Sequence, residues 1–134
     1  MQTSEPRPPR ADAPLLTLAT LGMVGYGLWA AAGAAADLAG PRVLEFWANL
    51  AAFVFGLILL LAAALVRVRM PGGLALAIGA LLGLQALALH AATHYAGANT
   101  LTWHLTRAAF AGTLVLLGFL GNRRPRRRPE SGSP

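Results

Sequence analysis

The chain has 134 residues, of which 56% are apolar and only 12% are charged, and its mean hydropathy is +0.56. This composition excludes an ordinary water-soluble domain, which needs a more polar surface. The lack of cysteine excludes disulfides, iron–sulfur clusters and cysteine nucleophiles. All basic residues are arginine, which excludes a Schiff-base lysine and a phosphate-loop lysine.

Four apolar stretches follow one another, each long enough to cross a bilayer as a helix, which takes about 20 residues. Their expected bounds are 14–36, 43–66, 74–95 and 101–120. The connections between them are short, so consecutive helices should be antiparallel neighbours. The sequence therefore predicts an all-α fold, an integral membrane four-helix up-and-down bundle that forms one domain over residues 14–121.

The arginines around these helices gather on one predicted side of the membrane, with only Arg42 in the opposite loops. Those on the first side are Arg7, Arg10, Arg67, Arg69, Arg123, Arg124, Arg126, Arg127 and Arg128. By the positive-inside rule this side is cytoplasmic, so both termini should lie there. The three tryptophans, Trp29, Trp47 and Trp103, fall at the opposite interface, where indole rings prefer the headgroup level. We expect a multi-pass protein of the bacterial cytoplasmic (inner) membrane.

The two ends of the chain differ from the apolar stretches in composition. Residues 1–13 and the Arg/Pro-rich residues 122–134 are too polar to bury a core and should be disordered cytoplasmic tails. The net charge of +6 arises from these tails and the helix ends, so no nucleic-acid partner is expected. A cleaved signal peptide is an alternative for the first helix, because small residues precede Asp37.

Small residues mark the expected contacts between helices, since close packing drives helix association in lipid. Three such pairs stand out, Gly22 with Gly25, Gly79 with Gly83, and Ala108 with Gly112. We expect them to pack mainly within one chain rather than between subunits.

All three histidines fall in the hairpin between the third and fourth helices, as His90, His94 and His104. His90 and His94 are four residues apart and share a helix face, and the short turn returns His104 to nearly the same depth. Glu45 starts the second helix at that level. Imidazoles and a carboxylate are ligand types for a transition metal, and histidine also ligates haem. The alternatives are structural hydrogen bonding by the histidines, or a ligand, quinone or proton site.

Arg107 lies one turn beyond His104, within the fourth apolar stretch. Ionisable groups at membrane depth are costly and usually have a partner inside the bundle. The expected partner of Arg107 is Glu45, and the other role we expect for Arg107 is contact with an anionic group.

The His90-x-x-x-His94 pair, following a basic turn after the second helix, resembles small four-helix membrane proteins of high-GC actinobacteria, whose third helix ends in such a pair. The resemblance implies a four-helix membrane fold and no established activity. This chain departs from the family pattern at Glu45-Phe46-Trp47, where those proteins carry an Asn-Glu-His triplet.

No nucleophile with an adjacent base can be assembled, so no catalytic residue is predicted. We predict a non-enzymatic membrane protein, either an accessory subunit of a membrane complex or a binder of a small ligand, with a metal or haem among the candidates. Its partners would be the lipid bilayer and either other subunits or further copies of itself. The alternative is a holin-like pore-forming protein, which would act by oligomerising. A proton-coupled transporter is disfavoured because the middle of the first two helices lacks a carboxylate.

Overall fold

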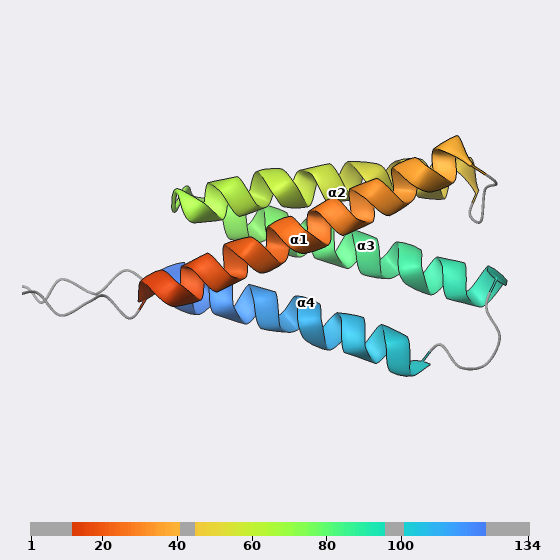
Figure 1. The fold of residues 1–134 in the computed structure, drawn as a ribbon. Coiled ribbons are helices and arrows are strands. Elements are labelled where there is room, and N and C mark those ends of the chain that lie inside the picture. Colours follow the sequence, from red (N-terminus) through yellow and green to blue (C-terminus); the bar gives the residue numbers. More distant parts are fainter. Residues whose placement is uncertain (1–11, 41–44, 96–100, 123–134) are drawn as a thin grey trace, which may run out of the picture.

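The computed structural model describes residues 12–40, 45–95 and 101–122. These residues form four helices, α1 (Asp12–Ala39), α2 (Phe46–Arg67), α3 (Gly73–Tyr95) and α4 (Leu101–Asn122), packed as an up-and-down bundle (Figure 1). The predicted all-α bundle is confirmed, with helix ends shifted by at most a few residues. Each helix is long and apolar enough to cross a membrane, so the chain is a multi-pass membrane protein.

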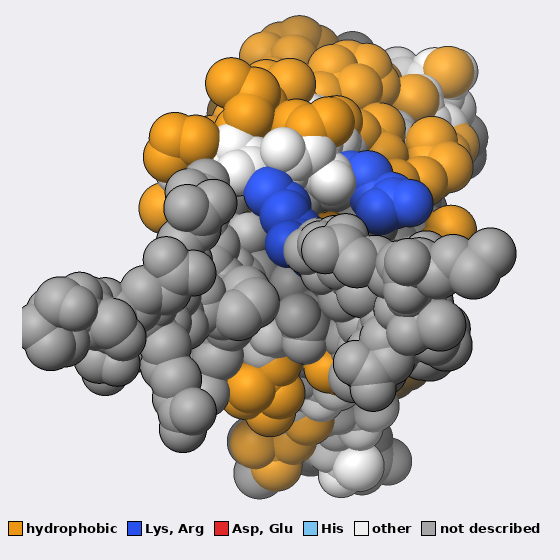
Figure 2. Space-filling view, turned by 90° about the vertical axis from the view of Figure 1, so that its left-hand side faces the viewer, with side chains coloured by type: hydrophobic (Ala, Val, Ile, Leu, Met, Phe, Trp, Pro, Cys, Tyr) orange, Lys and Arg blue, Asp and Glu red, His pale blue; other side chains and the backbone are white. Residues whose placement is uncertain are grey.

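The two ends of the bundle differ in their side chains. The end where α1 begins and α4 finishes also holds the α2–α3 turn with Arg67 and Arg69, and we call it the arginine end. Figure 2 looks onto this end and shows basic side chains next to apolar ones. At the opposite end Trp47 and Trp103 lie in the first turns of α2 and α4, so we call it the tryptophan end.

The α2–α3 turn is held by backbone hydrogen bonds. The Arg69 N–H donates to the Val66 carbonyl at 3.0 Å, and the Met70 N–H donates to the Leu65 carbonyl at 2.9 Å. This is the Schellman arrangement that closes many helices, with Arg69 at the left-handed position, φ 57°. The tight turn fixes α2 and α3 as antiparallel neighbours.

The hydrophobic core fills the half of the bundle nearer the arginine end. Its larger fully buried side chains include Leu16 and Met23 of α1 and Leu59 and Val66 of α2. Leu114 of α4 completes the core from the fourth helix. Small side chains between them let the helices approach closely, and these are Ala62, Ala63, Ala77 and Ala80.

A close approach of two backbones joins α1 and α2. A Cβ added to Gly56 would lie 2.9 Å from the Ala31 amide nitrogen and 3.0 Å from the Gly27 carbonyl oxygen. Neither Gly27 nor Gly56 was among the expected small pairs. Of those pairs, Gly22 packs against Leu114 and Gly83 against Phe55, whereas no described atom would meet a Cβ at Gly25, Gly79 or Gly112.

Helix α4 packs against α1 mainly near the arginine end. A Cβ on Gly121 would lie 2.8 Å from the Leu16 amide nitrogen, and one on Gly118 would lie 3.5 Å from the Met23 methyl carbon. Toward the tryptophan end α4 diverges from α1 and α2 (Figure 1). The half of the bundle nearer that end is therefore less tightly filled, and a cavity of about 500 Å³ lies there.

Candidate functional site

A cavity of about 500 Å³ lies among all four helices in the half nearer the tryptophan end. This volume falls in the range of about 300–1,000 Å³ that is typical of small-molecule sites. Its lining residues are Trp29, Ala30, Gly33, Ala34 and Asp37 of α1, Ala48, Asn49 and Ala52 of α2, Leu84, Leu87, Ala88, Ala91 and Ala92 of α3, and Trp103, His104 and Arg107 of α4.

The cavity exists because its walls are made mostly of alanine. Because α4 diverges from α1 and α2 toward this end (Figure 1), these small side chains do not fill the space between the helices. The few polar groups on the walls are Asp37, Asn49, His104 and Arg107, besides the two indoles. A mostly apolar cavity with a small number of polar groups is the usual form of a ligand site.

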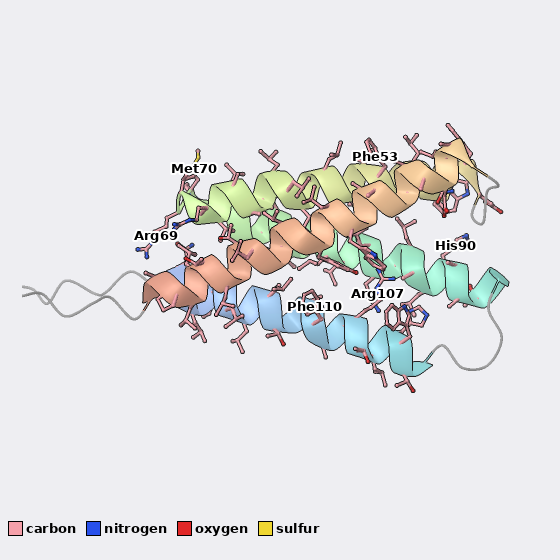
Figure 3. All side chains as sticks on the ribbon, in the orientation of Figure 1. Phe53, Arg69, Met70, His90, Arg107 and Phe110 are labelled. Atoms are coloured by element: carbon pink, nitrogen blue, oxygen red, sulfur yellow. The ribbon has the colours of Figure 1, made fainter. Side chains whose placement is uncertain are left out.

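Arg107 reaches from α4 toward α1 and bonds the hydroxyl of Tyr26 (Figure 3). Its Nε lies 3.1 Å and its Nη2 2.6 Å from Tyr26 Oη, and both donate to that oxygen. The guanidinium carbon also lies 5.8 Å from the centre of the Trp29 ring, close enough for a cation–π contact. Tyr26 is near the middle of α1, so the arginine charge is held deep in the membrane-spanning bundle.

Two aromatic contacts hold Tyr26 in place. Its ring stacks on Trp29 with a centroid distance of 6.1 Å, and the ring of Phe110 meets it edge-on at 5.8 Å. Such pairs contribute about 0.5–1.5 kcal/mol beyond their buried area. Sequence reasoning missed Tyr26, although a phenol in the middle of an apolar helix is a signal that a polar partner lies opposite.

The expected ion pair between Glu45 and Arg107 is wrong. Glu45 lies just before α2, is exposed, and accepts a hydrogen bond from the indole nitrogen of Trp47. Because α2 begins at Phe46, the Glu45 carboxylate stays at the surface of the tryptophan end. Arg107 lies nearly two turns into α4 and its side chain turns toward α1.

His104 is buried with 8% of its surface exposed, and it lines the cavity one turn from Arg107. Its Nδ1 has no hydrogen-bond partner in the part of the chain that the structure describes. The His104 carbonyl accepts a hydrogen bond from Gln85 Nε2 at 3.3 Å, which ties α3 to α4. A buried imidazole nitrogen without a partner thus belongs to a side chain that lines the cavity.

His90 faces another part of the bundle. Its ring lies 5.2 Å from the ring of Trp47 on α2, and it is not one of the cavity-lining residues. The side chain of His94 lies outside the described residues. Among the side chains that are described, no three histidine or acidic groups are placed to hold a metal ion. The three-histidine site for a metal or haem stays a prediction.

Asn49 is a further polar group of the cavity, buried at 1% exposure on α2. Asp37 lines the cavity eight residues beyond Trp29 on α1, a rise of about 12 Å toward the tryptophan end. The cavity thus carries a positive group deep in the bundle and a carboxylate nearer its outer end.

No protein-family model, curated protein or solved structure matches this chain. The function of this chain is therefore inferred from the geometry of the cavity.

Proposed function

We propose that this chain is a non-enzymatic integral membrane protein that binds a small, mostly apolar ligand in the alanine-walled cavity. The observation that carries the proposal is the cavity itself, which lies among all four helices and contains the buried His104 and the Arg107 guanidinium. Polar groups at membrane depth are costly and usually serve a site. Apolar side chains at these positions would also pack the four helices together. The polar lining therefore favours ligand binding, rather than helix packing alone, as the role of this region.

The proposed setting is the bacterial inner membrane with both termini in the cytoplasm. Arg67 and Arg69 lie at the same end of the bundle as the start of α1 and the end of α4, which supports a cytoplasmic position for that end. Trp47 and Trp103, exposed at the opposite end, suit the outer interface. The ligand cavity would then face the outer leaflet.

The holin-like alternative requires oligomers that open a pore. The single chain already has a buried core formed by all four helices, which favours a self-contained bundle. We expect no loss of culture density when the chain is overproduced in a bacterium. Lysis within the induction period would support the holin-like alternative instead.

Tryptophan fluorescence tests ligand binding, because Trp29 and Trp103 line the cavity and Trp47 does not. A Trp47→Phe protein in lipid nanodiscs would be titrated with a long-chain alcohol brominated near the middle of its chain. We expect quenching that saturates near one equivalent above the linear background from partition into lipid. Quenching that remains linear throughout would reject the cavity as a ligand site.

A pair of substitutions controls for quencher that reaches the indoles through lipid. Ala91→Phe adds a ring to the cavity wall, whereas Ala108→Phe adds the same ring at an exposed position of α4 that does not line the cavity. The saturable component should disappear with Ala91→Phe and persist with Ala108→Phe. If quenching still saturates in both variants, the bound quencher lies outside the cavity.

A further inference from the structure

Arg107 carries a permanent positive charge into the bundle, and its described hydrogen bonds go only to a neutral oxygen. A guanidinium has five N–H donors, and two of them are used by Tyr26 Oη. Within the described residues no carboxylate is paired with Arg107, since Glu45 bonds Trp47 and Asp37 lies nearer the tryptophan end. Three donors of the guanidinium therefore remain for a molecule in the cavity.

The Arg107 guanidinium lies inside the membrane-spanning bundle, where a counter-charge would stabilise it. An arginine inside a membrane helix is costly, because its charge is removed from water. The ring of Trp29 offsets part of this cost through the cation–π contact, but it does not neutralise the charge. A ligand with one negative charge would supply the counter-charge for Arg107 that the described part of the bundle lacks.

Two other groups of the cavity region are suited to hold an oxyanion. His104 Nδ1, on a side chain more than nine-tenths buried, has no partner among the described residues, and its tautomer with a proton on Nδ1 is a donor. Tyr26 Oη accepts both bonds from Arg107, which leaves its own proton to be donated. His104 and Arg107 are three residues apart on one face of α4, and both side chains line the cavity.

The rest of the lining determines what else the ligand must be. The walls around these donors are alanine and leucine, which suit a hydrocarbon chain. Asp37, nearer the tryptophan end, would repel a small dianion that arrived from water. A single negative charge on an apolar body, entering from the bilayer, fits both features.

We propose that the cavity binds an amphiphile with a singly charged anionic oxygen headgroup, a carboxylate or a phosphodiester, with the headgroup on Arg107 and His104 and the chain against the alanine walls. This inference rests on the proposed ligand-binding function and adds the chemical class of the ligand. A free fatty acid and an anionic phospholipid are the two sources of such a headgroup.

The test compares probes that differ only in their headgroup. The Trp47→Phe protein in nanodiscs of uncharged lipid would be titrated at pH 8 with a dibrominated fatty acid, the matched dibrominated alcohol and a phosphatidylglycerol with the same brominated chain. We expect at least one anionic probe to bind roughly tenfold or more tightly than the alcohol, which is the order expected for a charge-assisted hydrogen bond. Tighter binding of the free acid would identify fatty acids, and tighter binding of the phosphatidylglycerol would identify a lipid.

Variants then assign this preference to the named residues. Arg107→Gln should remove the preference for anionic probes while the alcohol still binds, Arg107→Lys should retain part of it, and His104→Ala should weaken anionic probes severalfold. Helical circular dichroism and a single peak in size exclusion would show that each variant is folded. If Arg107→Gln does not fold, Arg107→Lys and His104→Ala carry the test.

The outcomes separate the two proposals. Equal saturable binding of the alcohol and both anionic probes would overturn the anionic headgroup and leave the ligand-binding function standing. The absence of saturable quenching by any probe would overturn both. An anionic preference that persists unchanged in Arg107→Gln and His104→Ala would place the headgroup elsewhere and overturn the inference.

Discussion

Arg107 and Tyr26 are 81 positions apart in the chain, yet they share two hydrogen bonds across the α1–α4 boundary. At this scale the polar chemistry of the molecule depends on a few contacts between helices whose remaining surfaces are apolar. Gln85 makes another such contact, to the carbonyl of His104. Most threonine hydroxyls, in contrast, bond carbonyls of their own helix, as Thr106 and Thr113 do.

Removing the phenol hydroxyl tests the Arg107 contact. Tyr26→Phe keeps the ring packing against Trp29 and Phe110 but removes the acceptor of both arginine N–H groups. We expect a loss of stability of about 1.5–3 kcal/mol, because the lost hydrogen bonds come from a charged donor. Thermal unfolding in a mild detergent, followed by circular dichroism, measures the change.

Two control variants accompany that measurement. Thr113→Val removes an exposed hydroxyl that bonds only the Ala109 carbonyl of its own helix, so it should change stability by less than about 0.5 kcal/mol. Glu45→Gln should also have a small effect, since Glu45 does not pair with Arg107. A loss from Glu45→Gln as large as that from Tyr26→Phe would contradict the assigned partner.

At the scale of helices, the pairing of α1 with α2 depends on glycine at a specific position. Gly56 faces the backbone of α1 at Ala31 and Gly27, where there is no room for a side chain. Gly25, only two residues from Gly27, lies where no described atom would meet a Cβ. Glycine content alone therefore says little, because the rotation of each helix decides which glycines lie at a contact.

Adding a methyl group at these two positions gives opposite expectations. Gly56→Ala should destabilise the bundle by about 1–3 kcal/mol, the usual effect of overpacking, because the new Cβ would meet backbone atoms. Gly25→Ala should be neutral or stabilising by up to about 1 kcal/mol, since alanine favours a helix over glycine. The same unfolding measurement compares them, and equal effects would reject the assigned α1–α2 contact.

At the scale of the whole molecule, the two ends of the bundle have distinct tasks. The end near Arg67 and Arg69 contains the packed core, whereas the end near Trp47 and Trp103 contains the cavity. Such a division lets one half maintain the fold while the other half keeps space for a ligand. It also makes orientation in the membrane important, because it decides which leaflet the cavity faces.

The absence of cysteine makes this orientation simple to measure. Single variants Asn99→Cys and Ser131→Cys would be treated in bacterial spheroplasts with a membrane-impermeant maleimide. We expect Asn99→Cys to react in intact spheroplasts and Ser131→Cys to react only after permeabilisation, because the arginine-rich end should be cytoplasmic. The reverse pattern would place the cavity in the inner leaflet.

The four helices and their antiparallel order could be predicted from the sequence because bilayer thickness sets the helix length and short connections leave only neighbouring placements. It could also be predicted that His90, His104, Glu45 and Arg107 come from the half of the bundle nearer the tryptophan end. Which of these side chains meet could not be predicted, since one residue turns a helix by about 100° and so changes which neighbour a side chain contacts. For this reason the expected contact between Glu45 and Arg107 is not formed.

The sequence by itself thus determined that this is a multi-pass helical protein with four apolar spans, through the length and apolarity of each stretch. Only the tertiary structure decided that Arg107 bonds Tyr26, that His104 lines a cavity while His90 meets Trp47, and that Gly56 rather than Gly25 lies at the α1–α2 contact. The physical reason is that lipid solvates every apolar helix face equally well, so helix rotation is fixed by side-chain packing and hydrogen bonds between distant segments.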